Sequence, residues 1–355
     1  EKKELAVNVS GLKAKVGTEY FVNFSVTTVE PEPLIPEGYE IAHEQFRLPI
    51  DPASRSFSVQ GPALQCSENG NLLSVQSSRV AFVFDKSTGL VTSYKVKGTE
   101  YFHEGLGIQP NFWRASNDND YGSQMPKRLQ IWKQSSKNFN VVDASLAMDG
   151  KDAVLKVSYL LAAGNLYIAT YRIHPSGVVK ANYTFTSTEM EAAKTEASEA
   201  TLMATFTPGN EAIRKESSKL VVPRIGVRFR LPAEMEQVTY FGRGPEENYC
   251  DRNNGTLVGE YQATAEQMYF PYVRPQENGH HTDTRWLILK KKSGKGLAVY
   301  ADGTLEFNSL RNSIEDFDGE EATHRDYQWG NRDAEELKHD VSTAKNIKPR
   351  HTHIN

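Results

Sequence analysis

The sequence predicts an all-β protein whose main part is a large antiparallel β-sandwich. Three observations support this class. Many segments alternate apolar and polar residues and are rich in β-branched and aromatic side chains. Gly or Pro marks the turns between them, at a spacing of about eight to twelve residues. Little of the chain has a helical pattern. At 355 residues, the chain has room for one large β domain or two to three smaller ones.

Residues 1–52 are expected to contribute three strands, at residues 4–9, 18–29 and 39–49. Three strands are about half of a seven-stranded immunoglobulin-like sandwich, so one apolar face is left uncovered. Either these strands dock on the next domain, or the segment is the closing part of a divided domain. Residues 53–70 are expected to be a linker, because Pro, Ser and Gly are frequent there.

Residues 71–355 are expected to form the main domain. A hairpin is predicted at residues 79–96, with the turn at KSTG, and a short helix near residues 126–136. Four strands should follow between residues 139 and 186. Residues 187–219 fit either a helix or a flexible loop. Further strands are expected at 220–244, in a hairpin at 284–302 and at 304–314, and charge dominates from residue 315 onward.

Composition excludes several classes of function. The net charge of −4 and a pI near 6.2 give no electrostatic basis for binding nucleic acid or an anionic membrane. No apolar run is long enough to span a bilayer, and the first residues are not a signal peptide. The compartment stays open between cytoplasm and periplasm, because an excised fragment would lack its leader. Cys66 and Cys250 fit neither a disulfide framework nor a zinc site, so free thiols are expected.

The stretch from Phe241 to Arg285 is the densest in Gly, Pro, aromatic and polar residues, a mixture typical of binding loops on a β scaffold. It carries Glu246 and Glu247, and a second carboxylate pair, Asp118 and Asp120, lies in NDND. Glycosidases work with two such carboxyls. The favoured alternative is structural: the aspartates cap turns, and Glu247 pairs with Arg243 or Arg252.

Histidines and aromatic residues are further candidates. His280 and His281 follow ENG, and His351 and His353 close the sequence. No third ligand stands at a metal-binding spacing, so surface histidines near the chain end are expected. No serine-hydrolase, zinc-protease or nucleotide-binding motif is present. Aromatic rings beside amides and carboxylates suit sugar recognition, and packing beneath the loops is an equally weighted alternative. The aromatic candidates are Phe112, Trp113, Tyr121, Tyr249, Tyr269, Tyr272 and Trp286.

Three motifs together resemble the C-terminal region of glycoside hydrolase family 2 β-galactosidases. They are FWRASNDNDYG, FGRGPEENYCDR and YFPYVRPQENGHHTDTRW, and they occur in the family order within about residues 70–320. Two departures are Ser116-Asn117, where the family usually has a Pro-containing pair, and Cys250, where Pro is common. The resemblance implies that residues 1–52 close an immunoglobulin-like domain and that residues 71–355 form a galactose-mutarotase-like supersandwich, truncated at its C-terminus.

The resemblance also implies a division of labour. In this family the acid and the nucleophile lie on a catalytic barrel that this sequence lacks, and the mechanism is retaining. No residue here is therefore expected to be catalytic. No cofactor is expected in this chain, although the family often uses Mg and Na at the barrel. The implied partners are a β-galactoside or galactose, the missing barrel and, in the parent enzyme, further copies of the chain.

The expected contacts with sugar or with the active-site edge come in three groups. The first follows the predicted hairpin at 79–96, and the other two lie in the Phe241–Arg285 stretch. They are Arg114, Asp118, Asn119 and Asp120; then Glu247, Asn248, Tyr249 and Arg252; then Glu277, Asn278 and Arg285. Two alternatives remain open: a stand-alone carbohydrate-binding module or structural sandwich, and an aldose 1-epimerase in which His280 or His281 works with Glu247 or Glu277.

Overall fold

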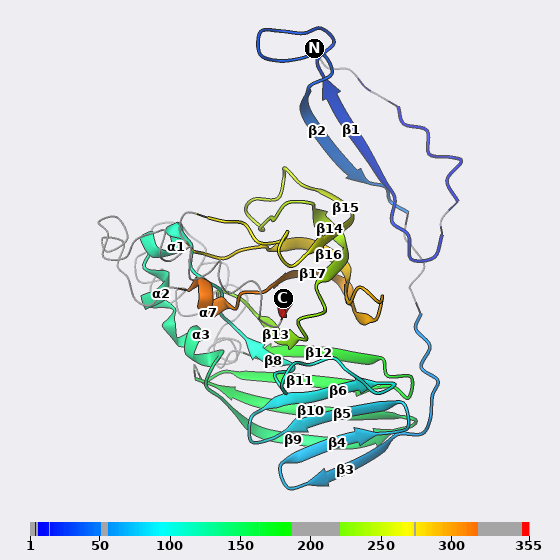
Figure 1. The fold of residues 1–355 in the computed structure, drawn as a ribbon, viewed down its shortest axis with the longest axis vertical. Coiled ribbons are helices and arrows are strands. Elements are labelled where there is room, and N and C mark those ends of the chain that lie inside the picture. Colours follow the sequence, from blue (N-terminus) through cyan, green and yellow to red (C-terminus); the bar gives the residue numbers. More distant parts are fainter. Residues whose placement is uncertain are drawn as a thin grey trace, which may run out of the picture. The chain divides into compact units, whose positions relative to one another are not determined.

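The computed structural model describes residues 4, 6–13, 15–50, 56–162, 164–186, 221–272, 275–318 and 350–354. The chain divides into two compact units, an N-terminal unit at Glu1–Ser58 and a C-terminal unit at Val59–Asn355. Nearly all regular structure is antiparallel β-sheet, which confirms the predicted all-β class (Figure 1). The assignment of the units to particular domain types stays a prediction.

The N-terminal unit contains a two-stranded sheet made of β1 (Phe21–Thr27) and β2 (Glu40–Arg47). The strand expected at residues 4–9 is not found among the described residues there. Alternation alone does not make a strand, because its backbone groups need a neighbouring strand as partner. Val26, Ile41 and Phe46 are each more than half exposed, as expected for strands whose apolar face has no cover within this unit.

Two sheets of the C-terminal unit pack against each other. One has the order β3-β4-β5-β6-β7 and the other β12-β11-β10-β9. The ring of Phe82 lies 5.7 Å from that of Tyr171 across the interface, and the Tyr159 hydroxyl donates to the carbonyl of Gly89 at 3.0 Å. The bounds are β3 Gln65–Asn69, β4 Leu72–Gln76, β5 Val80–Asp85, β6 Leu90–Val96, β7 Thr99–Glu100, β9 Phe139–Asp149, β10 Asp152–Leu161, β11 Leu166–Ile173 and β12 Val179–Thr186.

A third, seven-stranded sheet has the order β15-β14-β16-β17-β18-β13-β8. It joins the same core, because the Phe112 ring packs edge-on against Tyr167 of the four-stranded sheet at 5.2 Å. The strands are β8 Gln109–Asn111, β13 Gly226–Leu231, β14 Gln237–Gly244, β15 Leu257–Thr264, β16 His281–Lys290, β17 Gly296–Leu310 and β18 Arg350–Ile354. The loops at one end of this sheet build the candidate site.

Short helices interrupt the β pattern: α1 (Asp118–Gly122), α2 (Met125–Arg128), α3 (Gln130–Ser135) and α7 (Ile314–Phe317). The single helix predicted near residues 126–136 is thus divided into α2 and α3. In the NDND motif, Asn117 and Asp120 form a capping box at the start of α1, which confirms the predicted capping role for Asp120. No helix in the described ranges is long and apolar enough to cross a membrane.

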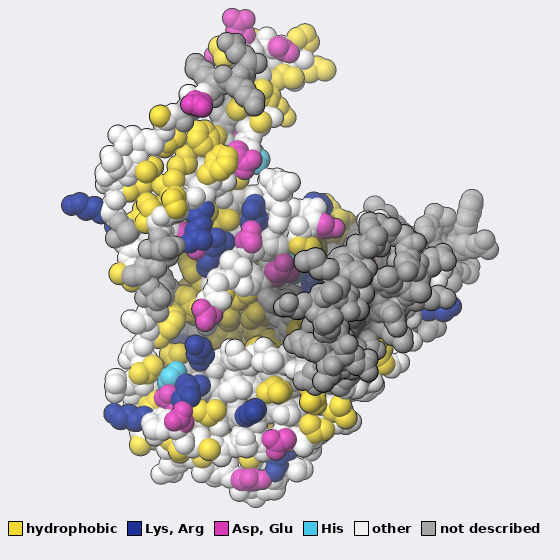
Figure 2. Space-filling model, turned by 180° about the vertical axis from the view of Figure 1, so that it is seen from behind, with side chains coloured by type: hydrophobic (Ala, Val, Ile, Leu, Met, Phe, Trp, Pro, Cys, Tyr) yellow, Lys and Arg dark blue, Asp and Glu magenta, His cyan; other side chains and the backbone are white. Residues whose placement is uncertain are grey.

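Two expectations differ from the structure. Residues 65–69, assigned to the linker by composition, form β3, because β4 supplies the hydrogen-bonding partner. The strand expected at 304–314 is the second half of the 15-residue β17, which runs without a break from the preceding hairpin. The helix-or-loop at 187–219 and most of the segment after 315 lie outside the described residues. On the face drawn in Figure 2, basic and acidic side chains are interspersed rather than gathered by sign.

Candidate functional site

A polar hollow of about 460 Å³ opens at the loop end of the seven-stranded sheet. Its volume falls within the range of roughly 300–1,000 Å³ typical of small-molecule sites. Four segments and one strand residue contribute to its wall. They are residues 114–119 after β8, residues 223–225 before β13, the turn 249–252, Tyr272 together with residues 276–280 before β16, and Glu306 on β17.

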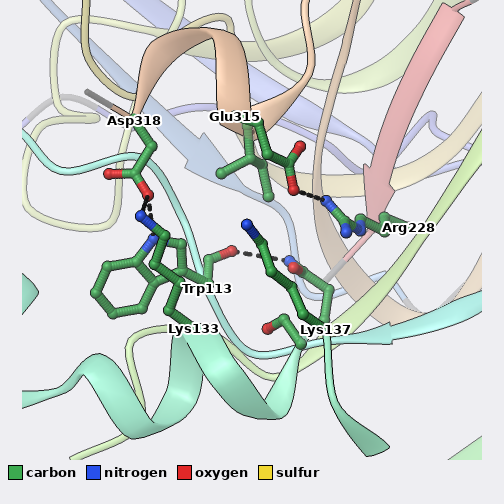
Figure 3. Close-up of a pocket in the computed structure, with 9 residues that line it drawn as sticks. Trp113, Lys133, Lys137, Arg228, Glu315 and Asp318 are labelled. Atoms are coloured by element: carbon green, nitrogen blue, oxygen red, sulfur yellow. Dashed lines mark hydrogen bonds and ion pairs between the residues drawn. The ribbon is translucent and has the colours of Figure 1, made fainter. Parts of the chain in front are cut away.

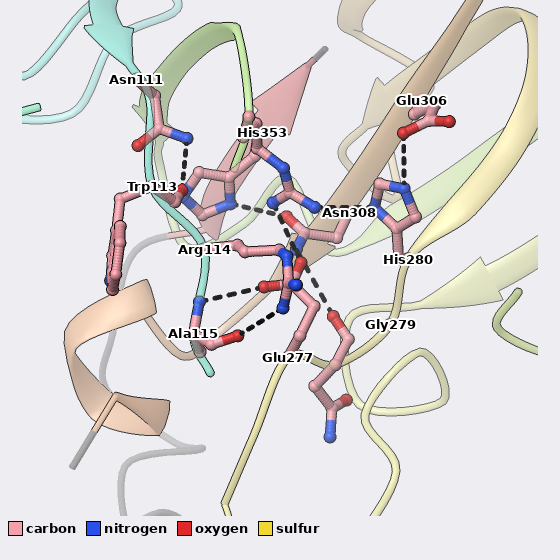
Figure 4. Close-up of polar contacts among 12 residues, drawn as sticks. Asn111, Trp113, Arg114, Ala115, Glu277, Gly279, His280, Glu306, Asn308 and His353 are labelled. Carbon is pink, nitrogen blue, oxygen red and sulfur yellow. Dashed lines mark hydrogen bonds and ion pairs between the residues drawn. The ribbon is translucent and has the colours of Figure 1, made fainter. Parts of the chain in front are cut away.

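The buried ion pair between Arg224 and Glu277 joins two of these segments. Nη1 of Arg224 lies 3.0 Å from Oε1 of Glu277, and both side chains are only about 5% exposed. Glu277 also accepts a hydrogen bond from the Ala115 amide at 3.2 Å and one from Asn308 at 3.2 Å (Figure 4). Buried charges persist only when paired and hydrogen-bonded, so this carboxylate holds the wall together.

Arg114 is fixed in a second ion pair, with Asp120 of α1. Nη2 of Arg114 donates to Oδ1 of Asp120 at 2.9 Å. Burial acts to lower the pKa of the Arg114 guanidinium, but the hydrogen bonds and charge of Asp120 outweigh it and raise that pKa. Asp120 also accepts from the Asn117 amide at 2.9 Å, so the helix cap and the arginine share one carboxylate.

Glu247 ties the turn 249–252 to the loop before β16. It accepts hydrogen bonds from the Tyr272 hydroxyl, from Arg252 at 3.0 Å and from the Gly279 amide at 2.8 Å. Of the two arginines proposed from the sequence as its partners, the structure selects Arg252. The Tyr249 hydroxyl also donates to Glu247, at 3.3 Å. With four donors already in place, Glu247 is a structural acceptor and not an available acid or base.

His280 lines the polar hollow and is 3% exposed. Nη2 of Arg224 lies 3.5 Å from its Nδ1, and its Nε2 lies 3.0 Å from Oε2 of Glu306. Because Arg224 can only donate, the neutral ring carries its proton on Nε2 and donates it to Glu306. Burial lowers the pKa of His280, which favours this neutral form, and the hydrogen bond from His280 lowers the pKa of Glu306.

Tyr249 is sandwiched at the edge of the hollow. Its ring stacks on His280 with centroids 5.3 Å apart, and the Arg252 guanidinium carbon lies 5.2 Å from its centre. Burial, helped by the nearby charges of Glu277 and Glu247, raises the pKa of the Tyr249 hydroxyl, so it stays protonated. The packed ring therefore shapes the wall more than it offers a free stacking face.

The eleven residues predicted from the sequence separate into three sets. Six line the hollow together: Arg114, Asp118, Asn119, Tyr249, Arg252 and Glu277. Four stand behind the wall and organise it: Asp120, Glu247, Asn248 and Asn278. Arg285 lies elsewhere, 5.7 Å from the centre of the Phe241 ring. Contact of any of them with sugar stays a prediction.

Asn248 and Asn278 illustrate the supporting role. Oδ1 of Asn248 accepts from both the amide and the hydroxyl of Thr282, at 2.9 and 2.7 Å. Asn278 bonds both backbone groups of Phe270, accepting at 2.9 Å and donating at 2.6 Å. These amides replace missing backbone partners in long loops, which explains their dense polar sequence.

Sequence reasoning missed Arg224, Gln276 and Glu306 in the wall, and the expectation of surface histidines near the chain end was wrong for His353. His280, His281 and His353 are each buried. His353 bonds Asn308 at 2.5 Å, and burial lowers the pKa of His281 to about 4. A partial signal existed for Glu306, since it alternates with apolar Leu305 and Phe307 and so belongs to the other face of its strand.

The aromatic candidates mostly serve the core. Phe112, Trp113 and Tyr121 are less than 9% exposed, and Trp286 stacks on Phe241 away from the hollow. Tyr269 packs on Phe317, again outside the wall. Of the seven rings considered, only Tyr249 and Tyr272 line the hollow. Packing under the loops therefore accounts for the larger part of this group.

A second cavity is too small to be a ligand site. It has about 10 Å³ of space, roughly one water molecule. At its wall Trp113 donates to Asp318 and Glu315 pairs with Arg228 (Figure 3). Both contacts are 2.7 Å long. Within the described residues no cluster of three or more potential metal ligands is present. Cys66 and Cys250 are free, and Cys250 lies exposed at the rim of the polar hollow.

Comparison with known proteins identifies the family. The profile described as "Beta galactosidase small chain" matches residues 76–348, and "Beta-galactosidase, domain 4" matches residues 1–49. The chain belongs to the β-galactosidase small-chain family. This agrees with the resemblance carried by the three sequence motifs.

Named relatives of the family are longer proteins. A β-galactosidase of Priestia megaterium is 30% identical over 275 residues, which cover 77% of this chain and 24% of that protein. A β-galactosidase of Streptococcus thermophilus is 26% identical over 310 residues, covering 85% of this chain and 26% of its own length. One from Arthrobacter is 43% identical over 83 residues. The chain spans about a quarter of the first two relatives.

Proposed function

We propose that this chain is the non-catalytic C-terminal part of a β-galactosidase that hydrolyses terminal β-D-galactose residues. The observation that carries the proposal is the family match over residues 76–348, together with β-galactosidase relatives about four times as long as the aligned part. The missing length is room for a catalytic domain. The parent enzyme would be a retaining glycosidase and a homo-oligomer.

The chemistry of the polar hollow supports a non-catalytic role. A retaining glycosidase needs two carboxyls about 5 Å apart, one free to attack and one free to give up a proton. Glu277 is instead locked by Arg224 and by two further donors, and Asp120 is shared between Arg114 and a helix cap. These groups hold loops in fixed positions. Such a wall can support the substrate side of a neighbouring catalytic domain.

The geometry gives little support to an epimerase. That reaction needs a buried histidine and a carboxylate that both reach the substrate. His281 and Glu247 do not line the hollow, and Glu277 is consumed by its ion pair. His280 faces the hollow, but its Nε2 proton is given to Glu306. No observation favours this alternative over the β-galactosidase part.

The test is reconstitution. The purified chain should not hydrolyse a chromogenic β-galactoside, whereas mixing it with the preceding part of its parent polypeptide should generate activity. Glu277→Gln should weaken reconstitution, because the wall loses its central charge. The matched control is Glu260→Gln on β15, an exposed residue outside the hollow. Turnover by the chain alone, or none after mixing, would overturn the proposal.

A further inference from the structure

Glu306 and Gln276 place unused hydrogen-bonding groups in the wall of the polar hollow. The Glu306 side chain is 40% exposed, and in the described part of the chain only its Oε2 is engaged, by His280 at 3.0 Å. Gln276 is half-buried in the wall and makes no hydrogen bond to any other described residue. Its amide therefore offers both a donor and an acceptor to a ligand.

The charges of the hollow argue against an anionic ligand. Three arginines and four carboxylates line it. Each arginine already faces a carboxylate of the protein: Arg114 faces Asp120, Arg224 faces Glu277 and Arg252 faces Glu247. Phosphate or carboxylate ligands need surplus positive charge and free guanidinium forks, which this wall does not provide. Among the groups left open are the second oxygen of the Glu306 carboxylate and the Gln276 amide.

A neutral polyhydroxylated ligand fits this set. A carboxylate accepts hydrogen bonds from two neighbouring hydroxyls, and an amide can both donate to and accept from others. His280 fixes the orientation of the Glu306 carboxylate before any ligand arrives, so less ordering is required on binding (Figure 4). We infer that the polar hollow binds the pyranose ring of a neutral saccharide and that Glu306 reads its hydroxyl groups.

The choice of a β-galactoside as the specific sugar rests on the proposed function, whereas the chemical class rests on the hollow itself. Cys250 supplies a built-in reporter, because it is exposed at the rim. The other cysteine, Cys66, is half-buried on β3, and burial raises the pKa of its thiol, which lowers its reactivity. In a Cys66→Ser variant, alkylation by iodoacetamide then reports on Cys250 alone.

The experiment follows the rate of Cys250 alkylation by intact-protein mass spectrometry while methyl β-D-galactoside is titrated. We expect saturable protection. Glu306→Gln and, separately, Gln276→Ala should each weaken the apparent affinity about tenfold, as for loss of one strong hydrogen bond. The control Glu260→Gln should keep the wild-type affinity. Circular dichroism melts confirm that each variant is folded, and the second variant keeps the test informative if the first unfolds.

Three results would overturn the inference. They are protection that never saturates, protection by inorganic phosphate equal to that by the galactoside, and full affinity in both hollow variants. None of these bears on reconstitution, which measures turnover by the assembled enzyme. Conversely, failed reconstitution with retained protection would reject the proposed function and leave saccharide binding in place.

Discussion

Removing the carboxylate of Glu277 should destabilise the C-terminal unit severely. In Glu277→Ala, the guanidinium of Arg224 stays buried with its facing charge gone, and the Ala115 amide and Asn308 lose an acceptor. Breaking a buried ion pair from one side costs about 3–5 kcal/mol. Since whole domains are stable by about 5–15 kcal/mol, this is a large share of the total.

A double-mutant cycle isolates the ion pair from the other contacts. Arg224→Met alone leaves Glu277 buried and unpaired and should be similarly costly. In the double variant neither charge remains, so only the lost acceptor contacts still weigh on stability. Each variant loses some free energy of unfolding relative to the wild type. We therefore expect the sum of the two single-variant losses to exceed the loss in the double variant by about 2 kcal/mol or more.

Urea denaturation followed by tryptophan fluorescence gives the free energies of unfolding for the four proteins of the cycle. Glu260→Ala is the control, because that side chain is exposed and makes no contact with the wall. It should leave the midpoint unchanged. If the single losses simply add up in the double variant, Arg224 and Glu277 are not coupled, and their ion pair does not hold the wall together.

Two further predictions concern other positions. Burial alone would raise the pKa of Glu315, but Arg228, 2.7 Å away, lowers it to about 2. The stability that this carboxylate contributes is therefore fully present above its unfolded pKa of about 4.5 and is lost as the pH falls through 2. Because the side chain is 38% exposed, solvent screening reduces this contribution to about 1 kcal/mol. The melting-temperature difference between wild type and Glu315→Gln should vanish near pH 2, and a constant difference would contradict this. In Gly242→Ala, the new Cβ would lie 2.4 Å from Oγ1 of Thr284, which should cost about 1–3 kcal/mol in urea denaturation. Gly255→Ala, with open space around it, should be neutral, and equal midpoints for the two variants would refute the packing argument.

The glycines of the FGRGP motif show why part of the pattern could be noticed but not explained from sequence. Gly242 and Gly244 stand where a Cβ would collide with Thr284 and with the Tyr240 hydroxyl. Their spacing resembles a phosphate-binding turn only superficially, since no helix follows. At Gly242 the close approach is to Thr284 of β16, 42 positions away, and at Gly244 the ring of Tyr261 on β15 adds to the contact from Tyr240.

Most strands were predictable because each depends on a local period of two, which the residues of that strand carry themselves. The strand predictions failed where the presence of a neighbouring strand determines whether a segment forms a strand. Residues 4–9 alternate as well as β1 does but have no neighbouring strand among the described residues, while residues 65–69 read as a linker and pair with β4. The helix at 126–136 divides where Leu129 leaves helical geometry.

The sequence by itself determined the all-β class, the family through three long motifs, and the loops in which six residues of the polar hollow lie. Only the tertiary structure decided which carboxylates are engaged in ion pairs and which keep an oxygen available to a ligand. Glu277 and Glu306 look equally available in the sequence. In the fold, Arg224 occupies the first, and His280 engages a single oxygen of the second. Arg224 and Glu277 are 53 positions apart in the sequence. A local sequence pattern cannot predict pairings over such a separation.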